Sequence, residues 1–222
     1  MSEVTVTVRG EHETRVAPER ATIRVSVRAE GSERSPVVEH AMRLTEPVRD
    51  SITARKESGV IVDWTSTRLS VRAERPWNNE GKRLAPIYYA SIDLTATFID
   101  ASDLSIWVSD VSPWDGVEVG SVSWHLTPET NARLEREVAS EAVGVAVARA
   151  RAYATALGLH DVEPIEIADA GLIAPTAAAP PAGMAKFRGM VQESGDMTGA
   201  SMAYEPDAIV ITATVEARFV AR

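Results

Sequence analysis

Apolar and polar residues alternate along several stretches of the chain, which is the pattern of a strand with one buried face. The alternation predicts strands at residues 4–8, 21–29, 60–75, 84–98, 117–126, 162–169 and 208–220. Glycine and proline favour a turn at residues 10–18, between the first two strands. The turn-forming residues 76–83 favour the tip of a long antiparallel hairpin between the third and fourth strands.

A different spacing, with apolar residues three and four positions apart, predicts a helix, and a short second helix is expected further along the chain. The first begins at Ser35-Pro36 and ends near Gly59. Pro47 inside it predicts a kink, because proline lacks the backbone N–H that a regular helix needs. The second helix is capped by Asp100 or Ser102 and ends before Pro113.

A third, alanine-rich helix is predicted from Pro128 to Gly158, with proline in its first turn and glycine at its C-terminal end. Small residues let such a helix approach a sheet closely, so we expect it to lie flat across one. Its expected buried stripe consists of Leu134, Val138, Ala142, Val145, Ala148, Ala152 and Ala156.

These elements together predict an α+β fold. We expect one mostly antiparallel sheet of about seven strands, with the two longer helices on one face and one short helix in addition. Residues 1–222 are expected to form one domain. A long segment without periodicity, residues 170–207, interrupts it as a variable and flexible loop, and such loops are either functional or disordered.

Composition narrows the class of protein. Hydrophobic residues make up 45% and charged residues 25% of the 222 residues, as in folded globular proteins. The net charge of -9 disfavours nucleic acid as a partner, because phosphate backbones are bound mainly by lysine and arginine. The chain has no cysteine, which excludes disulfides and thiolate chemistry. No apolar run is long enough to cross a bilayer, so integral membrane association is not expected.

The first residues of the sequence do not have the pattern of an export signal. They alternate from the start and have neither a basic region nor an apolar core segment. We therefore expect a cytoplasmic protein.

Candidate chemistry is sparse. The chain has four histidines, and none lies in a recognisable catalytic motif. The cluster that most resembles a metal site is His160, Asp161 and Glu163, and a second such group surrounds His12. Both groups can equally be ordinary polar residues in contact with solvent. We expect no catalytic residue, no cofactor and no metal.

Candidate interaction residues lie elsewhere. Trp77 is at the predicted hairpin tip, where it is either an anchor for a partner, since aromatic residues are enriched at interfaces, or a cover for the hairpin's own side chains. Met184, Phe187 and Met190 lie in the long loop, where flexible methionines suit adaptable binding. We take these four as speculative interaction residues.

Several stretches resemble the SIMPL-domain family, also called DUF541, which includes periplasmic immunogenic proteins and predicted oxidative-stress-defence proteins. The opening VTVRGE at residues 6–11 and APERATI at 17–23 are similar to its first two strands, and TSTRLSV at 65–71 with YYAS at 88–91 to its central hairpin. The clearest likeness runs from WHL at 124–126 into ARARAYA at 148–154 and LGL at 157–159. The resemblance implies a fold and no catalytic residues. Many members carry a signal peptide, and Gly-Tyr is common where this chain has Ile87-Tyr88.

Three functions remain open from the sequence. The favoured one is a non-enzymatic SIMPL-like interaction or scaffold protein that forms homo-oligomers, with a link to stress response implied by the resemblance. The second is a metal-dependent enzyme that uses His160, Asp161 and Glu163 or His12. The third is a small-ligand binder whose lid is the loop at residues 170–207.

Overall fold

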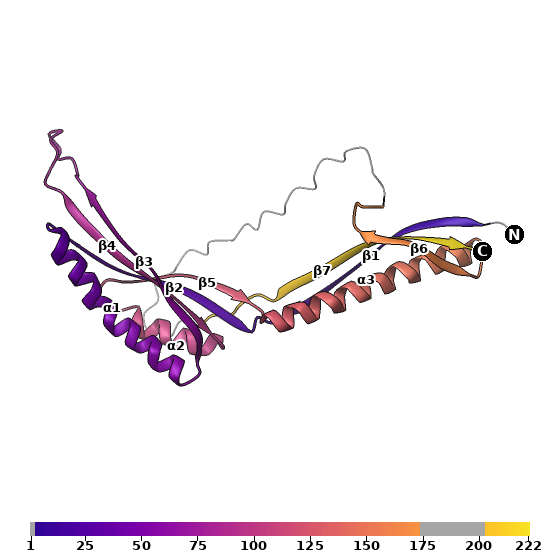
Figure 1. Ribbon diagram of the computed structural model, residues 1–222, viewed down its shortest axis with the longest axis horizontal. Coiled ribbons are helices and arrows are strands. Elements are labelled where there is room, and N and C mark those ends of the chain that lie inside the picture. Colours follow the sequence, from indigo (N-terminus) through magenta and orange to yellow (C-terminus); the bar gives the residue numbers. More distant parts are fainter. Residues whose placement is uncertain (1–2, 174–202) are drawn as a thin grey trace. The chain divides into compact units, whose positions relative to one another are not determined.

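A computed structural model describes residues 3–173 and 203–222 (Figure 1). The fold is α+β, and its strands form antiparallel sheets, which confirms the predicted class. The elements in chain order are β1 Val4–Val16, β2 Arg20–Gly31, α1 Arg34–Glu57, β3 Ile61–Glu74, β4 Ile87–Phe98, α2 Ala101–Val111, β5 Val117–His125, α3 Pro128–Ala156, β6 Val162–Asp169 and β7 Ile209–Ala221. The prediction of a single sheet is wrong, because these strands form a three-stranded sheet in the order β1-β7-β6 and a four-stranded sheet in the order β3-β4-β2-β5.

The described residues fall into two compact units, each with one of the two sheets. Unit 1 comprises residues 3–16, 128–173 and 208–222, and unit 2 comprises residues 17–127 and 203–207. The long helix α3 belongs to unit 1, whereas α1 and α2 belong to unit 2. The two longer helices therefore cover different sheets and not one common face.

The predicted turn at residues 10–18 is wrong over most of its length. β1 continues through Gly10 to Val16 and pairs with β7 in an unbroken register from Val4 with Ala221 to Val16 with Ile209. β1 and β2 therefore do not form a hairpin with each other. Gly10 is needed for packing, because a Cβ atom there would overlap the backbone oxygen of Ala142 in α3.

Helix α3 has the predicted length, and its buried stripe is only partly the predicted one. The buried residues are Leu134, Val138, Ala142, Ala146, Ala150 and Ala154. Beyond Ala142 the expected stripe is wrong, since Ala148, Ala152 and Ala156 are exposed. Each observed step is four residues, which turns the stripe by about 40° around the helix axis. A stripe that winds in this way follows a sheet that twists beneath it.

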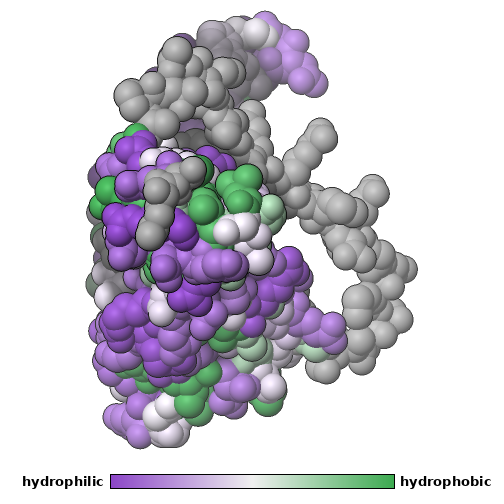
Figure 2. Space-filling view, turned by 90° about the vertical axis from the view of Figure 1, so that its right-hand side faces the viewer, coloured by the Kyte–Doolittle hydropathy of each residue, from purple (hydrophilic) through white to green (hydrophobic). Residues whose placement is uncertain are grey.

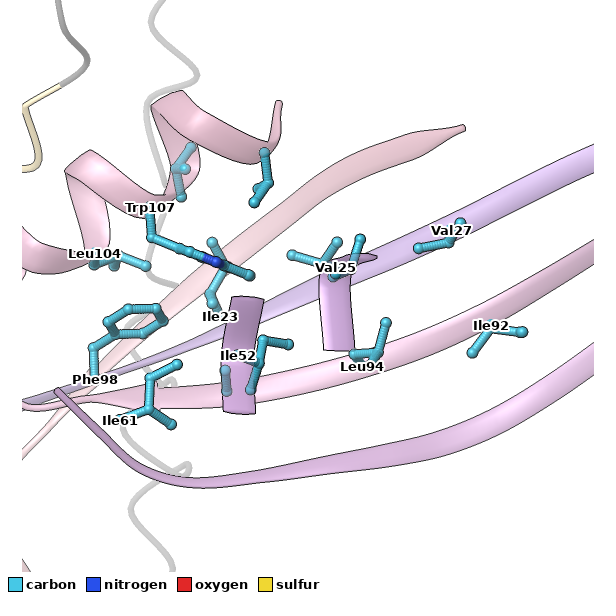
Figure 3. Packing of buried hydrophobic residues seen from close by; sticks show 14 of the residues in the cluster. Ile23, Val25, Val27, Ile52, Ile61, Ile92, Leu94, Phe98, Leu104 and Trp107 are labelled. Carbon is cyan, nitrogen blue, oxygen red and sulfur yellow. The ribbon is translucent and has the colours of Figure 1, made fainter. Parts of the chain in front are cut away.

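Unit 2 has a core of large side chains between its sheet and its two helices. The predicted hairpin of β3 and β4 is present, with β4 in the interior of the sheet between β3 and β2. Figure 3 shows side chains of β2 and β4 pointing toward residues of α1 and α2. Phe98 and Trp107 are fully buried, and their ring centroids lie 5.3 Å apart.

The start of α2 follows a local signal, whereas α1 begins after Glu33 without a side-chain cap. Asp100 caps α2, as predicted, and its side chain accepts hydrogen bonds from the backbone N–H groups of Ser102 and Asp103. These contacts, chiefly the one from Ser102, hold the pKa of Asp100 below its usual range. α1 remains continuous through Pro47, and the kink predicted there stays a prediction.

Candidate functional site

Trp77 lies at the tip of the β3–β4 hairpin with 62% of its surface exposed. It forms an isolated antiparallel bridge with Arg83, whose guanidinium carbon lies 4.9 Å from the centre of the indole ring. The turn beyond it is held by Asn78, whose side-chain oxygen accepts hydrogen bonds from the backbone N–H groups of Glu80 and Lys82. The hairpin therefore presents Trp77 on an ordered tip, as the turn-forming residues predict.

In unit 1, strand β1 lies at an edge of the sheet and pairs with β7 on one side. Four edge strands occur in the two described sheets: β1, β6, β3 and β5. Register shifts interrupt the pairing of β6, of β3 and of β5 with their neighbours, whereas the pairing of β1 has none. Because bulges help to protect a sheet edge from further pairing, β1 is the least protected of these four edges.

Helix α3 packs against β1, next to the free edge of this strand. The Arg149 side chain donates a hydrogen bond of 2.7 Å to the backbone oxygen of Arg9, so this position of α3 faces β1. Tyr153 follows four residues later, and Leu157, the residue just after the end of α3, follows after four more. Leu157 N–H still donates to the carbonyl oxygen of Tyr153, so the two side chains lie along the same ridge. They are 54% and 62% exposed, which leaves an apolar ridge beside the first residues of β1.

Strand β6, at the opposite edge of the same sheet, is poorly covered. α3 packs on β1 and β7 and has few contacts with β6. Ile167 pairs with Ala217, which is buried under α3, so Ile167 lies on the helix side of the sheet although it is 56% exposed. Ile165 is 54% exposed. Pro164 and a register shift next to it disturb the start of this strand.

The other face of this sheet is polar and carries ion pairs across the strands. Arg9 of β1 contacts Glu216 of β7 at 2.9 Å, and Arg218 of β7 contacts Glu166 of β6 at 2.9 Å. The hydrogen bond from Arg9 holds the pKa of Glu216 below its usual range. In Figure 2 the visible surface is largely hydrophilic, and its hydrophobic residues form small separate groups.

The two alternative metal-ligating groups, one around His160 and one around His12, lie at different places in unit 1. His12 pairs with Ala213 and Glu163 with Val220, seven positions apart along β7, which is about 23 Å in a strand. Glu163 contacts the Arg222 guanidinium at 3.2 Å, and the backbone N–H groups of His160 and Asp161 donate to the carbonyl oxygen of Arg222. Among residues 3–173 and 203–222, no group of three or more His, Asp or Glu side chains could hold a metal ion.

A hollow of about 480 Å³ in unit 2 is a candidate for a small ligand. Its lining residues include Arg28, Glu118, Arg72 and Tyr89. Arg28 pairs with Glu118 at 2.7 Å, and the Arg72 guanidinium lies 5.1 Å from the centre of the Tyr89 ring. Two of the arginines that line this hollow thus already contact neighbouring side chains.

Three of the predicted interaction residues, Met184, Phe187 and Met190, lie outside the described residues, as does most of the proposed lid at 170–207. After that segment, Tyr204 packs edge-on against Trp124 with ring centroids 5.9 Å apart, and its backbone N–H donates to Ser105. Burial raises the pKa of Tyr204.

Sequence reasoning missed Tyr153, Leu157 and Ile167 as surface features. The available signal was a tyrosine and a leucine four residues apart on a helix face that otherwise carries alanine, threonine and charged residues. For Ile167 no local signal existed, because its exposure depends on where α3 lies over the sheet.

The comparisons with known proteins agree with the resemblance in the sequence. The family described as SIMPL, a protein of unknown function (DUF541), matches residues 6–219 and so spans both units. No curated protein matches the chain. No helix in the described ranges 3–173 and 203–222 is long and apolar enough to cross a membrane. That residues 1–222 act as one domain stays a prediction. With nearly its whole length matched, the chain belongs to the SIMPL (DUF541) family.

Proposed function

We propose that this chain is a non-enzymatic interaction protein that assembles with copies of itself by adding a strand to the edge of β1. The observation that carries the proposal is the unbroken edge of β1 beside the exposed ridge of Tyr153 and Leu157. An added strand would gain backbone hydrogen bonds from β1 and an apolar contact from the helix. The Arg149 side chain already donates a hydrogen bond to the backbone oxygen of Arg9. The part of the edge that is open to a new strand therefore lies at residues 4–8.

The strand that fits this edge best is β6 of a second copy. In each copy α3 is shifted toward β1, which leaves Ile167 on the helix side of β6 uncovered. Placed beside β1 of a neighbour, β6 would bring this isoleucine under the neighbour's Tyr153 and Leu157. Pro164 cannot donate a backbone hydrogen bond, so we expect pairing only from Ile165 to the end of the strand.

Charge favours the same pairing. β6 contains Glu163, Glu166 and Asp169 and no basic residue. A contact between two β6 strands would oppose like charges, which destabilises cross-strand pairs. The open part of the β1 edge, residues 4–8, contains only valine and threonine and so opposes no like charge to β6. β6 is therefore expected to pair with β1 of another copy.

Such a contact joins two different surfaces and is repeated by every copy. Heterologous contacts produce a ring when the rotation between neighbours closes, and an open filament when it does not. The proposal therefore expects an assembly of several chains and not a closed twofold dimer.

Light scattering of the purified chain tests the assembly. We expect a mass several times the 23.9 kDa of one chain. The double variant Tyr153→Glu/Leu157→Glu should lower the mass to that of one chain, because it places charge on the ridge. The control Met42→Glu/Ile106→Glu changes two residues of unit 2 that are 55% and 59% exposed, and it should leave the mass unchanged.

Mixing two variants tests the head-to-tail arrangement. Tyr153→Glu/Leu157→Glu keeps an intact β6, and Ile167→Glu keeps an intact β1 edge. Each alone should be monomeric, and the mixture should form a complex of two chains through the one remaining contact. A wild-type chain that stays monomeric at its highest soluble concentration would refute the proposal, and a mixture that stays monomeric would refute the pairing of β1 with β6.

A further inference from the structure

We propose that the tip of the β3–β4 hairpin, residues 75–84, binds the headgroup region of an anionic lipid surface. This inference goes beyond self-assembly and uses a different unit of the molecule. It concerns contact with a membrane surface and not a span across it.

The tip exposes apolar side chains on both of its faces. Trp77 and Arg83 are bridge partners, so their side chains share one face. Leu84 follows Arg83 and points to the opposite face, since successive side chains of an extended chain alternate. Trp77 and Leu84 are 62% and 48% exposed. A medium that surrounds the tip covers both, whereas a flat protein surface covers only one.

The charges of the tip favour an anionic medium. Residues 75–84 contain Arg75, Lys82 and Arg83 and one acidic residue, Glu80, in a chain with a net charge of -9. Lys82 and Glu80 are 3.6 Å apart and largely exposed, so water screens this pair strongly. An anionic surface therefore attracts the tip and repels most of the remaining chain, which orients the molecule with the tip toward the lipid.

The stacking of Arg83 on Trp77 suits the interface between headgroups and acyl chains. Tryptophan is enriched at this depth because its ring is apolar and its N–H is polar. The Arg83 guanidinium lies over the ring, so it can contact a phosphate while the indole enters the interface. Both groups are already in place before binding.

The backbone of the tip is ordered in a way that limits the entropy lost on binding. Leu84 N–H donates to the carbonyl oxygen of Pro76 at 2.9 Å, and Asn78 N–H to that of Lys82 at 2.9 Å. Gly81 completes the turn with a φ of 76°, which glycine adopts without strain. The tip therefore has its binding conformation before it meets the lipid, and little backbone entropy is lost on binding.

Co-sedimentation with vesicles tests this proposal. The wild-type chain should bind vesicles of phosphatidylcholine and phosphatidylglycerol, and it should bind pure phosphatidylcholine much more weakly. Lys82→Ala/Arg83→Ala should reduce binding by about fivefold for each cation removed. The control Lys56→Ala/Arg133→Ala changes the net charge equally at exposed positions that are not part of the tip, and it should retain most of the binding.

Trp77→Ala separates lipid binding from a protein contact. We expect this variant to lose most vesicle binding while its thermal unfolding and its mass in solution stay unchanged, since Trp77 is exposed and lies outside unit 1. Equal binding of wild type and Trp77→Ala, or no binding of the wild type to anionic vesicles, would overturn the inference. So would a lowered mass of Trp77→Ala, because the tip would then contact a second copy.

Discussion

The two units pack helices on sheets in opposite ways. In unit 2, large side chains fill the space between the sheet and its helices, including Trp107, Phe98, Ile52 and Leu104. In unit 1, the helix surface that meets the sheet is made largely of alanines, and the strand below it contains Gly10. One unit is stabilised by the volume of its core and the other by the closeness of its backbones.

This difference decides what each unit tolerates. A core of large side chains loses stability when atoms are removed, because the surrounding structure collapses only in part. Where two backbones approach closely, as in unit 1, few side-chain atoms can be removed. Added atoms destabilise such a contact, because they force the backbones apart. A substitution that removes side-chain volume should therefore destabilise unit 2 more than unit 1. A substitution that adds volume at the contact between helix and sheet should destabilise unit 1 more.

The largest expected effect is from Trp107→Ala in unit 2. Trp107 is fully buried, lies beside Phe98 and donates an indole N–H hydrogen bond of 3.0 Å to Ser51. Its loss should lower the free energy of unfolding by about 3–5 kcal/mol, measured by denaturant titration. Trp77→Ala is the matched control and should change it by less than about 1 kcal/mol. If both variants lost a similar free energy of unfolding, Trp107 would not be a central residue of the unit 2 core.

The next largest effect is expected from Gly10→Ala in unit 1. The new methyl group would meet the backbone of Ala142 and Ala146, which cannot turn aside as a side chain can. We expect a loss of about 1–3 kcal/mol or more in the free energy of unfolding. Gly144→Ala is the control, because a Cβ there meets nothing within 4 Å, and it should stabilise α3 by about 0.5–1 kcal/mol. A neutral Gly10→Ala would show that α3 does not approach β1 so closely.

A smaller effect is expected at the cap of α2. Asp100→Ala should cost about 1 kcal/mol at neutral pH, because two backbone N–H groups lose their acceptor. Since the pKa of Asp100 is lowered in the folded chain, this contribution is present above the unfolded pKa and is lost as the pH falls through the folded pKa. The difference between wild type and Asp100→Ala should thus shrink below about pH 4. A difference that stays constant into acid would refute the role of the ionised cap.

Local signals in the sequence predict much of unit 2. The hairpin of β3 and β4 follows from alternation and from the turn formers around Asn78, and the start of α2 follows from Asp100. Both features depend on residues that are close in sequence. For the same reason the place of Trp77 at the hairpin tip could be predicted before the fold was known.

Unit 1 could not be predicted in the same way. A glycine such as Gly10 has the same sequence signature whether it turns the chain or allows a helix to approach, and only the pairing of β1 with β7 decides between them. Alanines lie on several faces of α3. The sequence therefore does not tell whether Ala148 or Ala150 is the buried one. The ridge of Tyr153 and Leu157 cannot be recognised from the sequence alone, because its role depends on the nearby edge of β1.

The central position of β7 in its sheet also determines the order in which the units can be completed during synthesis. All four strands of the unit 2 sheet lie between Arg20 and His125, so the ribosome has released them long before the end of the message. β1 emerges first, yet its pairing partner is β7, which ends at Ala221. At about 5–20 residues per second, β1 waits for roughly 10–40 seconds without its neighbour. A nascent chain that stalls before β7 therefore has a complete unit 2 sheet and an unpaired, valine-rich first strand, which is the form that chaperones and proteases would meet.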